Sequence, residues 1–353
     1  MSAHASAQPS RVPRRPRVPN ATLVRSLGLV ALGALALFLL SELLGDYEDL
    51  QLASGSYYFI VLAGLTMLTG LSGQISLGHG ALMAVGAYTV ALLVGNEHWA
   101  LVPALAAATA VTAAVGVLVG AAASRLRGPY LAGATLAFAV GLPALAEKYS
   151  GTFGGANGLI INPPTVPSGL GQSFPLERWE AWIAGIGVLV VLFAMNNLAR
   201  SGLGRSLRAV RDDEIAASLC GLHVGRVQTL AFVVSAACAG LGGGMLAVVL
   251  QLAAPGAFEL GLSLSLLTAV VLGGLGSQIG AIWGAAVLVL LPGWSNDIAH
   301  SFSLSTNVSA NLPLAIYGVV LIGAMLVWPT GIQGALRRII ALARRSPAGG
   351  DGS

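Results

Sequence analysis

Residues 70–80 read GLSGQISLGHG, and this stretch decides how the chain is organised. It interrupts a charge-free apolar segment, residues 56–94, that is far longer than the roughly 20 residues needed for one membrane-spanning helix. A break in a helix at membrane depth is tolerated only inside protein or beside a water-filled cavity. The sequence therefore predicts two helices joined by a break near 70–80.

A second long apolar segment, residues 260–291, is interrupted by GGLGSQIG at 273–280. The two interruptions are weakly similar, since GLSGQI at 70–75 parallels GLGSQI at 274–279. An internal repeat is typical of transporter folds, but chance similarity between glycine-rich sequences explains the likeness equally well. The prediction of a second helix pair therefore does not rest on the repeat.

The composition indicates that most of the chain lies in lipid. Hydrophobic residues make up 56% of the chain, charged residues make up 9%, and the mean hydropathy is +0.81. A soluble domain carries about 25% charged residues, so a water-facing surface is excluded for most of this chain. Further apolar candidate spans follow the same length rule. They cover residues 23–40, 100–123, 129–146, 181–198, 229–250 and 312–328.

Basic residues set the orientation of these helices. Most of the 18 Lys and Arg residues fall in the N-terminal region, at Arg125 and Arg127, in 200–226 and in 337–345. The positive-inside rule places all four basic regions in the cytoplasm, which requires each interrupted segment to contain two helices. We expect an all-α polytopic membrane protein with about ten transmembrane helices, broken near 70–80 and 273–280, and with both termini cytoplasmic.

The charge distribution divides the chain into three regions. Residues 1–22, rich in Pro and Arg, are expected to form a disordered basic cytoplasmic tail. Residues 23–335 are expected to form the transmembrane domain, and residues 336–353 a basic cytoplasmic C-terminal tail. Within the transmembrane domain, 199–228 is the main cytoplasmic segment and 149–180 is the longest external loop.

Polar residues at the two breaks indicate a translocation path. Polar and ionisable groups at membrane depth are costly in lipid and point to function by default. Close helix packing through small residues, with Gln and Ser as hydrogen-bonding groups, is the alternative explanation. The candidate path residues are Gly73, Gln74, Ser76, Gly78, His79, Gly80 and Gln278.

Two other classes of protein would use the same stretch differently. Residues 70–73 have the GxSG form of an intramembrane serine protease, but no His lies within a separate membrane helix to act as the base. His79 could instead carry protons in an ion-coupled secondary transporter. The predicted spans have no carboxylate at mid-depth, which such a transporter usually needs.

The chain lacks the residues of a nucleotide or metal site. Lys148 is the only lysine and follows Glu147, so there is no GxxxxGK[ST] phosphate-binding loop. Cys220 and Cys238 provide neither a disulfide framework nor a cysteine cluster for a metal. We therefore expect no catalytic residues, no metal, no cofactor bound by this chain and no nucleic-acid partner.

The cytoplasmic segment 199–228 is predicted to contain a short helix that begins at the carboxylate run 212–214, because carboxylates suit the positive end of a helix dipole. Ala216, Ala217 and Gly221 would leave a small-residue face on which a partner could pack closely. From composition alone, a solvated cytoplasmic loop is the better explanation of this segment.

Several motifs resemble a known family. EIAA at 214–217, with Gly221 four positions later, is similar to the EAA---G coupling loop of ABC-importer permeases. GLSGQISLGHGA at 70–81, followed by GAY at 86–88, resembles the hallmark segment of branched-chain (hydrophobic) amino-acid ABC transporter permeases. The ordered similarity covers about residues 56–345. Further similar stretches are LRGPYL at 126–131, TLAF at 135–138, GGANGL at 154–159, GGLGSQIG at 273–280 and WPTGI at 328–332.

The resemblance implies a transmembrane permease domain that forms the pore of an ATP-driven importer. This importer would move branched-chain or other hydrophobic amino acids across the bacterial inner (plasma) membrane. Permeases of the same family for urea, amides or other small solutes are the alternative, and the similarity to the coupling loop disfavours a channel.

The resemblance also implies partners. They are a second permease subunit in a hetero-dimeric pore, two cytoplasmic ATP-binding subunits that carry the ATP and Mg, an extracytoplasmic substrate-binding protein, and the lipid bilayer. The chain itself would be a transporter permease and not an enzyme. The residues implied to couple to the ATP-binding subunits are Arg205, Arg208, Asp212, Asp213, Glu214, Ala217 and Gly221.

Overall fold

Nearly all described residues lie in helices. The computed structural model describes residues 21–126, 129–167, 169, 171, 174–301, 312, 315–316, 318–319, 322–323 and 331–344. The first half contains α1 (Ala21–Leu43), α2 (Asp46–Ser72), α3 (His79–Val90) with a π-helical extension (Ala91–Asn96), α4 (Leu101–Ala123), α5 (Pro129–Lys148), α6 (Ser150–Phe153), a 3-10 turn (Gly155–Asn157) and β1 (Leu159–Ile160). The second half contains α7 (Leu176–Arg200), α8 (Gly202–Asp212), α9 (Glu214–Leu219), α10 (Val224–Val249), β2 (Leu252–Ala253), a 3-10 turn (Pro255–Phe258), α11 (Leu260–Gly273), α12 (Gln278–Ser301) and α14 (Gly331–Arg344).

The prediction of an all-α polytopic membrane protein is confirmed. Within the described residues, eight helices are long and apolar enough to cross a membrane, and α12 begins with a further apolar stretch, Gln278–Trp294. Both interrupted segments form two helices, as predicted. Residues 73–78 (the first break) separate α2 from α3, and residues 274–277 (the second break) separate α11 from α12. The last predicted span, 312–328, lies largely outside the described residues.

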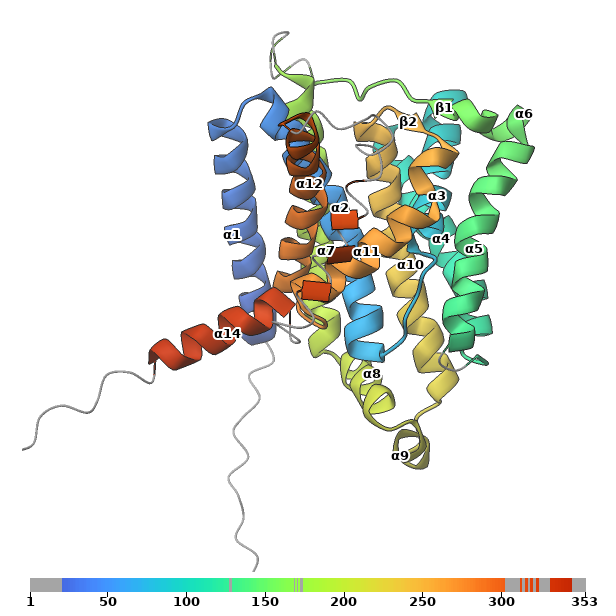
Figure 1. The fold of residues 1–353 in the computed structure, drawn as a ribbon, viewed down its shortest axis with the longest axis vertical. Helices are drawn as coiled ribbons and strands as arrows, with labels where there is room; N and C mark the ends of the chain where they lie inside the picture. Colours follow the sequence, from blue (N-terminus) through green and yellow to red (C-terminus); the bar gives the residue numbers. More distant parts are fainter. Residues whose placement is uncertain are drawn as a thin grey trace, which may run out of the picture.

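The chain places its basic segments at one end of the bundle (Figure 1). The start of α1, the short helices α8 and α9, and the start of α14 all lie at this end. The positive-inside rule assigns it to the cytoplasm. Most of the predicted tail 1–22 lies outside the described residues, and the predicted tail 336–353 begins as helix, because α14 continues to Arg344.

The opposite, external end carries the connection from α5 to α7. α7 already begins at Leu176, so the predicted external loop 149–180 ends a few residues earlier than expected. Within this connection, β1 pairs antiparallel with β2, with Leu159 opposite Ala253. This short ladder fixes the external connection to the end of α10.

α10 is the centre of the bundle. In α2 and α10, 78% of each apolar stretch is buried. The glycine run 240–244 lets neighbouring helices approach α10 closely, as is common in membrane bundles. A Cβ at Gly243 would overlap the Met83 carbonyl of α3, and one at Gly240 would lie 2.5 Å from the Thr112 side chain of α4.

α1 lies at the periphery of the bundle. Only 11% of its apolar stretch is buried, and it packs against α7. The Ser26 hydroxyl donates to the Asn197 side chain at 2.7 Å and accepts from Asn196 at 2.9 Å. At the other end of the helix, Trp182 donates to the Ser41 hydroxyl at 2.9 Å. These contacts attach α1 to α7 without placing it in the core.

The close contact of α3 with α10 predicts that Gly243→Ala destabilises the protein by about 1–3 kcal/mol, because overpacking a tight site strains the backbone. Gly141→Ala in α5 is the matched control, since nothing lies within 4 Å of a Cβ at that position. Unfolding midpoints of the detergent-solubilised variants measure the difference. Equal midpoints for the two variants would show that the contact at Gly243 is not tight.

Candidate functional site

The first break begins where α2 ends in a glycine cap. Gly73 adopts a left-handed conformation with φ of 72°, which glycine reaches without a steric penalty. Its N–H donates to the Thr69 carbonyl at 3.2 Å, and the Gln74 N–H donates to the Leu68 carbonyl at 3.3 Å. Local sequence therefore ends α2 where the glycine pattern predicts.

The first residue of α3, His79, is completely buried. Its Nε2 lies 2.7 Å from the Ser235 hydroxyl of α10, and its Nδ1 lies 3.0 Å from the Ser76 hydroxyl. Both ring nitrogens therefore have a partner, as a buried imidazole requires. The contact with Ser235 holds the start of α3 against the central helix α10, and the contact with Ser76 orients the ring from the first break.

Backbone N–H groups in the first break and at the start of α3 donate to side chains of distant helices. The Leu77 N–H donates to the Thr135 hydroxyl of α5 at 3.0 Å. The Gly80 N–H donates to the Ser263 hydroxyl of α11 at 3.0 Å. Thr135, Ser235 and Ser263 were not among the predicted site residues. The only signal in the sequence is that each is a hydroxyl in an otherwise apolar helix.

The predicted path residues of the first break mostly face the interior of the single chain. Gln74, Ser76 and His79 are 7%, 1% and 0% exposed, and Gly78 and Gly80 are also buried, whereas Gly73 is exposed. In the single chain these groups hold the break together. The exposed side chain of this break is that of Ile75, which is 55% exposed. That the path residues line a translocation path stays a prediction.

The intramembrane protease alternative needs a histidine beside Ser72. The Ser72 hydroxyl instead donates to the Gln74 side chain at 3.3 Å. His79 contacts Ser76 and Ser235 instead. The GxSG sequence therefore forms the capped end of α2, and among the described residues Ser72 has no hydrogen bond to a histidine.

The second break contacts the end of α2 through backbone. Gly274 and Gly276 both have positive φ values, 117° and 76°. A Cβ at Gly70 would overlap the amide nitrogen of Gly276, so only glycine permits this contact. Gly331, the first residue of α14, approaches Gly274 so closely that a Cβ there would lie 2.6 Å from the Gly274 Cα. The end of α2, the second break and the start of α14 thus meet at one junction. We call these four glycines the glycine junction.

Gln278 begins α12 directly after the second break. It is partly exposed, and its side-chain oxygen is buried with no hydrogen-bond partner within the described part of the chain. An unpaired buried polar atom costs free energy. The Gln278 oxygen is such an unsatisfied acceptor beside the glycine junction. Gln278 remains a candidate path residue.

The cytoplasmic segment 199–228 folds as two short capped helices. The Ser201 hydroxyl accepts from the Gly204 N–H at the start of α8 at 3.4 Å. At the start of α9, the Asp213 carboxylate accepts from the N–H groups of Ile215 and Ala216 at 2.9 and 3.0 Å. Asp213 therefore acts as a helix cap, which a carboxylate at this position favours.

Of the small residues predicted to form an exposed face on this segment, Ala216 and Gly221 are exposed, and the prediction for Ala217 needs correction. Ala217 is only 4% exposed, because α9 turns that side toward the protein. Gly221 is exposed, but its φ of 85° closes α9, with the Leu222 N–H donating to the Ala217 carbonyl at 3.1 Å. The exposed side chains of α9 are those of Ile215, Ala216, Ser218 and Leu219. The two large apolar ones, Ile215 and Leu219, are 73% and 84% exposed and dominate the outward face.

The other predicted coupling residues make local contacts. Arg205 and Arg208 donate to the carbonyls of Arg200 and Ala199 at 3.3 and 3.0 Å, at the end of α7. Cations at this position suit the negative end of the α7 dipole. Glu214 accepts from the Gln228 side chain of α10 at 2.8 Å, which joins α9 to that helix.

Asp212 is paired with a residue that the sequence prediction omitted. Asp212 accepts from Nε and Nη2 of Arg211 at 3.0 and 2.8 Å. The remaining Nη1 of Arg211 donates to the Gly70 carbonyl of α2 at 2.6 Å. Arg211 therefore connects the cytoplasmic segment to the glycine junction.

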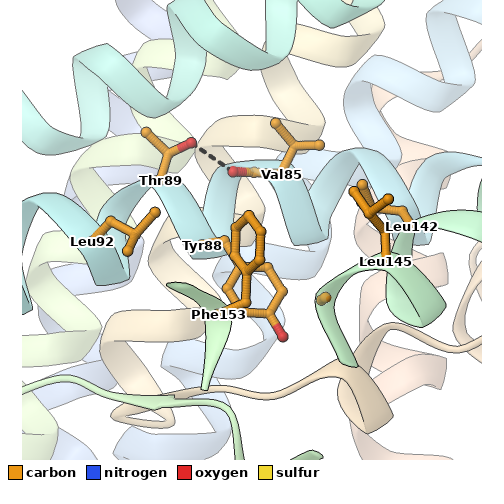
Figure 2. A pocket seen from close by; sticks show the side chains of 8 residues that line it. Val85, Tyr88, Thr89, Leu92, Leu142, Leu145 and Phe153 are labelled. Atoms are coloured by element: carbon orange, nitrogen blue, oxygen red, sulfur yellow. Dashed lines mark hydrogen bonds between the residues drawn. The ribbon is translucent and has the colours of Figure 1, made fainter. Parts of the chain in front are cut away.

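An apolar cavity of about 150 Å³ lies beside α3 (Figure 2). The Tyr88 and Phe153 rings pack edge to face across it, with centroids 5.2 Å apart. The Tyr88 hydroxyl is buried without a hydrogen-bond partner in the part of the chain that the structure describes. The lining residues are Val85, Tyr88, Thr89, Leu92, Leu142, Leu145, Ala146 and Phe153.

The fold is a polytopic membrane bundle in which two interrupted segments lie beside a short helix pair, and interrupted helices of this kind are typical of membrane transporters. The family described as the permease component of branched-chain amino acid transport systems matches residues 49–328, and this chain belongs to that family. It is a transporter component and not an enzyme.

Relatives agree with this family. The chain is 34% identical to the high-affinity branched-chain amino acid transport system permease protein LivM of Escherichia coli, over 82% of this chain and 72% of LivM. It is 28% identical to the high-affinity branched-chain amino acid transport system permease protein LivH of E. coli, over 79% of this chain and 92% of LivH. It is 30% identical to the ribose import permease protein RbsC of E. coli, over 76% of this chain and 81% of RbsC. No solved structure matches the chain.

The contact between His79 and Ser235 predicts that Ser235→Ala destabilises the protein by about 1–3 kcal/mol, because it leaves a buried ring nitrogen unpaired. Thr109→Val is the matched control, since the Thr109 hydroxyl donates only within its own helix, to the Leu105 carbonyl. Denaturant titration in mild detergent measures both. An equal, small effect of the two variants would contradict the role of Ser235.

Proposed function

We propose that this chain forms one half of the pore of an ATP-driven importer in the bacterial inner membrane. Its proposed substrates are branched-chain or other hydrophobic amino acids. The supporting observation is the family membership together with the 34% identity to the LivM permease over 82% of this chain. The ribose permease relative, at 30% identity, makes another small solute such as urea or an amide the alternative substrate class.

The proposed energy source is a pair of ATP-binding subunits that dock on segment 199–228, and the ATP and Mg would be bound there. Ile215 and Leu219 lie on α9 and are 73% and 84% exposed. α9 lies at the cytoplasmic end of the bundle, below the lower ends of α2 and α10 (Figure 1). Exposed apolar side chains rimmed by polar residues are typical of a protein contact.

The proposed second half of the pore is a different permease. LivM and LivH of E. coli carry the same transport-system name, and this chain is 34% and 28% identical to them. Apolar side chains next to the two breaks are exposed in the single chain, with Ile75 at 55% and Leu275 at 56%. A partner permease on this side would place the path between the two subunits.

An extracytoplasmic binding protein would deliver the substrate to the external end. The connection between α5 and α7 is tied to α10 by the β1–β2 pair, which gives a defined surface at that end. Because the binding protein would select the substrate, the pore needs no charged group for an aliphatic side chain.

An ion-coupled carrier is the weaker alternative. Among the described residues, the buried carboxylates are Asp49 and Glu180, and both lie in the first two turns of their helices at the external end. Asp49 is already paired with Arg178 at 3.3 Å. A proton path through the membrane centre would need a carboxylate at mid-depth, where the described chain has none.

Reconstitution of the chain with a second permease and two ATP-binding subunits tests the proposal. Uptake of labelled leucine into proteoliposomes should require ATP and a loaded binding protein. Unlabelled isoleucine and valine should compete, whereas urea and ribose should not. Uptake driven by a pH gradient in the absence of ATP-binding subunits would support the ion-coupled alternative and overturn the proposal.

The exposed apolar pair predicts that Leu219→Ser weakens docking of the ATP-binding subunits. Loss of about 1.5–3 kcal/mol of apolar burial corresponds to about a tenfold or larger loss of affinity. Co-purification and titration of the subunits in detergent measure this. Leu252→Ser is the matched control, since Leu252 is 36% exposed at the opposite end of the molecule. Undiminished docking of the Leu219 variant would place the contact elsewhere.

A further inference from the structure

We propose that Arg211 is the positioning residue that passes movement of segment 199–228 to both broken helices. This inference rests on the proposed function, because it assumes that ATP-binding subunits move this segment. Beyond the proposed function, it names the residue through which movement of segment 199–228 reaches the transmembrane helices.

The first contact is made with the end of α2. α2 ends at Ser72, so the Gly70 carbonyl belongs to the last turn, whose carbonyls have no partner within the helix. Nη1 of Arg211 donates to this carbonyl at 2.6 Å. A hydrogen bond from a charged donor is stronger than a neutral one, and a cation suits this end of the helix dipole.

The stem of Arg211 is fixed as well. A Cβ at Gly73 would lie 2.8 Å from Cγ of Arg211, so the glycine cap of α2 makes room for the arginine stem. Arg211 therefore contacts the first break through its stem and the end of α2 through its guanidinium. Both contacts would be lost if the side chain were shortened.

Asp212 sets the direction of the guanidinium. One carboxylate oxygen accepts from Nε and Nη2 of Arg211, which leaves Nη1 directed at Gly70. The two side chains are 40% and 65% exposed, so the ion pair adds little stability by itself. Its contribution is to hold the arginine fork in one orientation.

The far side of Gly70 leads to the second break. A Cβ at Gly70 would overlap the Gly276 amide nitrogen, so no side chain separates the two backbones. Gly274, in the same break, is in similarly close contact with Gly331 at the start of α14. A displacement of the α2 end cannot be absorbed by side-chain rotation here, and it would move the second break as well.

The other arginines of α8 do not make this connection. Arg205 and Arg208 donate to carbonyls at the end of α7, directly next to α8 in the chain. The hydrogen bond from Arg211 to the Gly70 carbonyl instead joins α8 to α2, across 141 positions of the sequence. Arg211 is thus placed to carry movement, whereas its neighbours secure the local turn.

The test uses the complete importer in proteoliposomes, with Arg211→Met as the main variant. We expect this variant to assemble and to hydrolyse ATP, while the amount of leucine transported per ATP falls by about tenfold, within the usual range for coupling between sites. Arg211→Lys keeps the positive charge but lacks the forked guanidinium, so the amount of leucine transported per ATP should fall less. Arg226→Met, an exposed arginine of the same segment, is the matched control and should transport as the wild type does.

Two cysteine probes separate docking from transmission. The natural Cys220 is exposed next to Leu219, so its protection from a thiol reagent reports docking of the ATP-binding subunits. A Leu275→Cys probe in a Cys220→Ser background reports the second break, because Leu275 is 56% exposed. In the Arg211→Met chain, Cys220 protection should persist while the response of the Leu275→Cys probe to nucleotide disappears.

The outcomes distinguish the inference from the proposed function. If the wild-type complex does not couple ATP hydrolysis to uptake, the proposed function fails. If the wild type couples and Arg211→Met couples equally well, only the inference is overturned. If Arg211→Met does not assemble, Asp212→Asn replaces it as the test variant, because Asp212 is exposed and Asn has nearly the same shape as Asp. Its expected partial loss of coupling supports the inference, and unchanged coupling overturns it.

Discussion

The fold depends on one constraint: at membrane depth, each backbone polar group needs a partner within the protein. A continuous helix satisfies its own backbone groups, but two of the apolar segments of this chain are interrupted, at residues 73–78 and 274–277. At the first break, hydroxyls of Thr135 and Ser263 accept from backbone amides, and Ser235 pins His79 at the start of α3. Three helices are therefore held around a single irregular segment. The glycines of α10 bring α2, α3 and α4 close to this central helix, which places Ser235 beside His79.

Much of this organisation could be predicted from the sequence. Segment lengths and the positions of basic residues are enough to predict the breaks and the parity of the helices. The glycine that caps α2 and the aspartate that caps α9 act on neighbouring residues, so local sequence signals them. The hydroxyl partners of the break could not be predicted, because Ser235 is 156 positions from His79 and only the fold brings them together. The orientation of α9 was also missed, since a helix of 6 residues has too few turns to define a face, and Ala217 lies inside while Ile215 lies outside.

The position of the breaks relates structure to transport. A continuous helix resists bending, whereas a glycine cap followed by an irregular segment leaves a joint whose geometry is held by a few hydrogen bonds. In this protein the joints of two helices touch, and the cytoplasmic segment contacts them through one charged side chain. A permease built in this way concentrates its deformable parts at one site and keeps the rest of the bundle rigid through close helix packing.

The loose attachment of α1 has a consequence for how such permeases diversify. The family match begins at residue 49, after α1 has ended, and α1 touches the remainder mainly along α7. An element that packs mainly on one neighbouring helix at the rim is a module that evolution can add, lengthen or replace without disturbing the core. Fusion of a new domain or anchor at this edge would leave the transport machinery intact, so variation among relatives should accumulate here first.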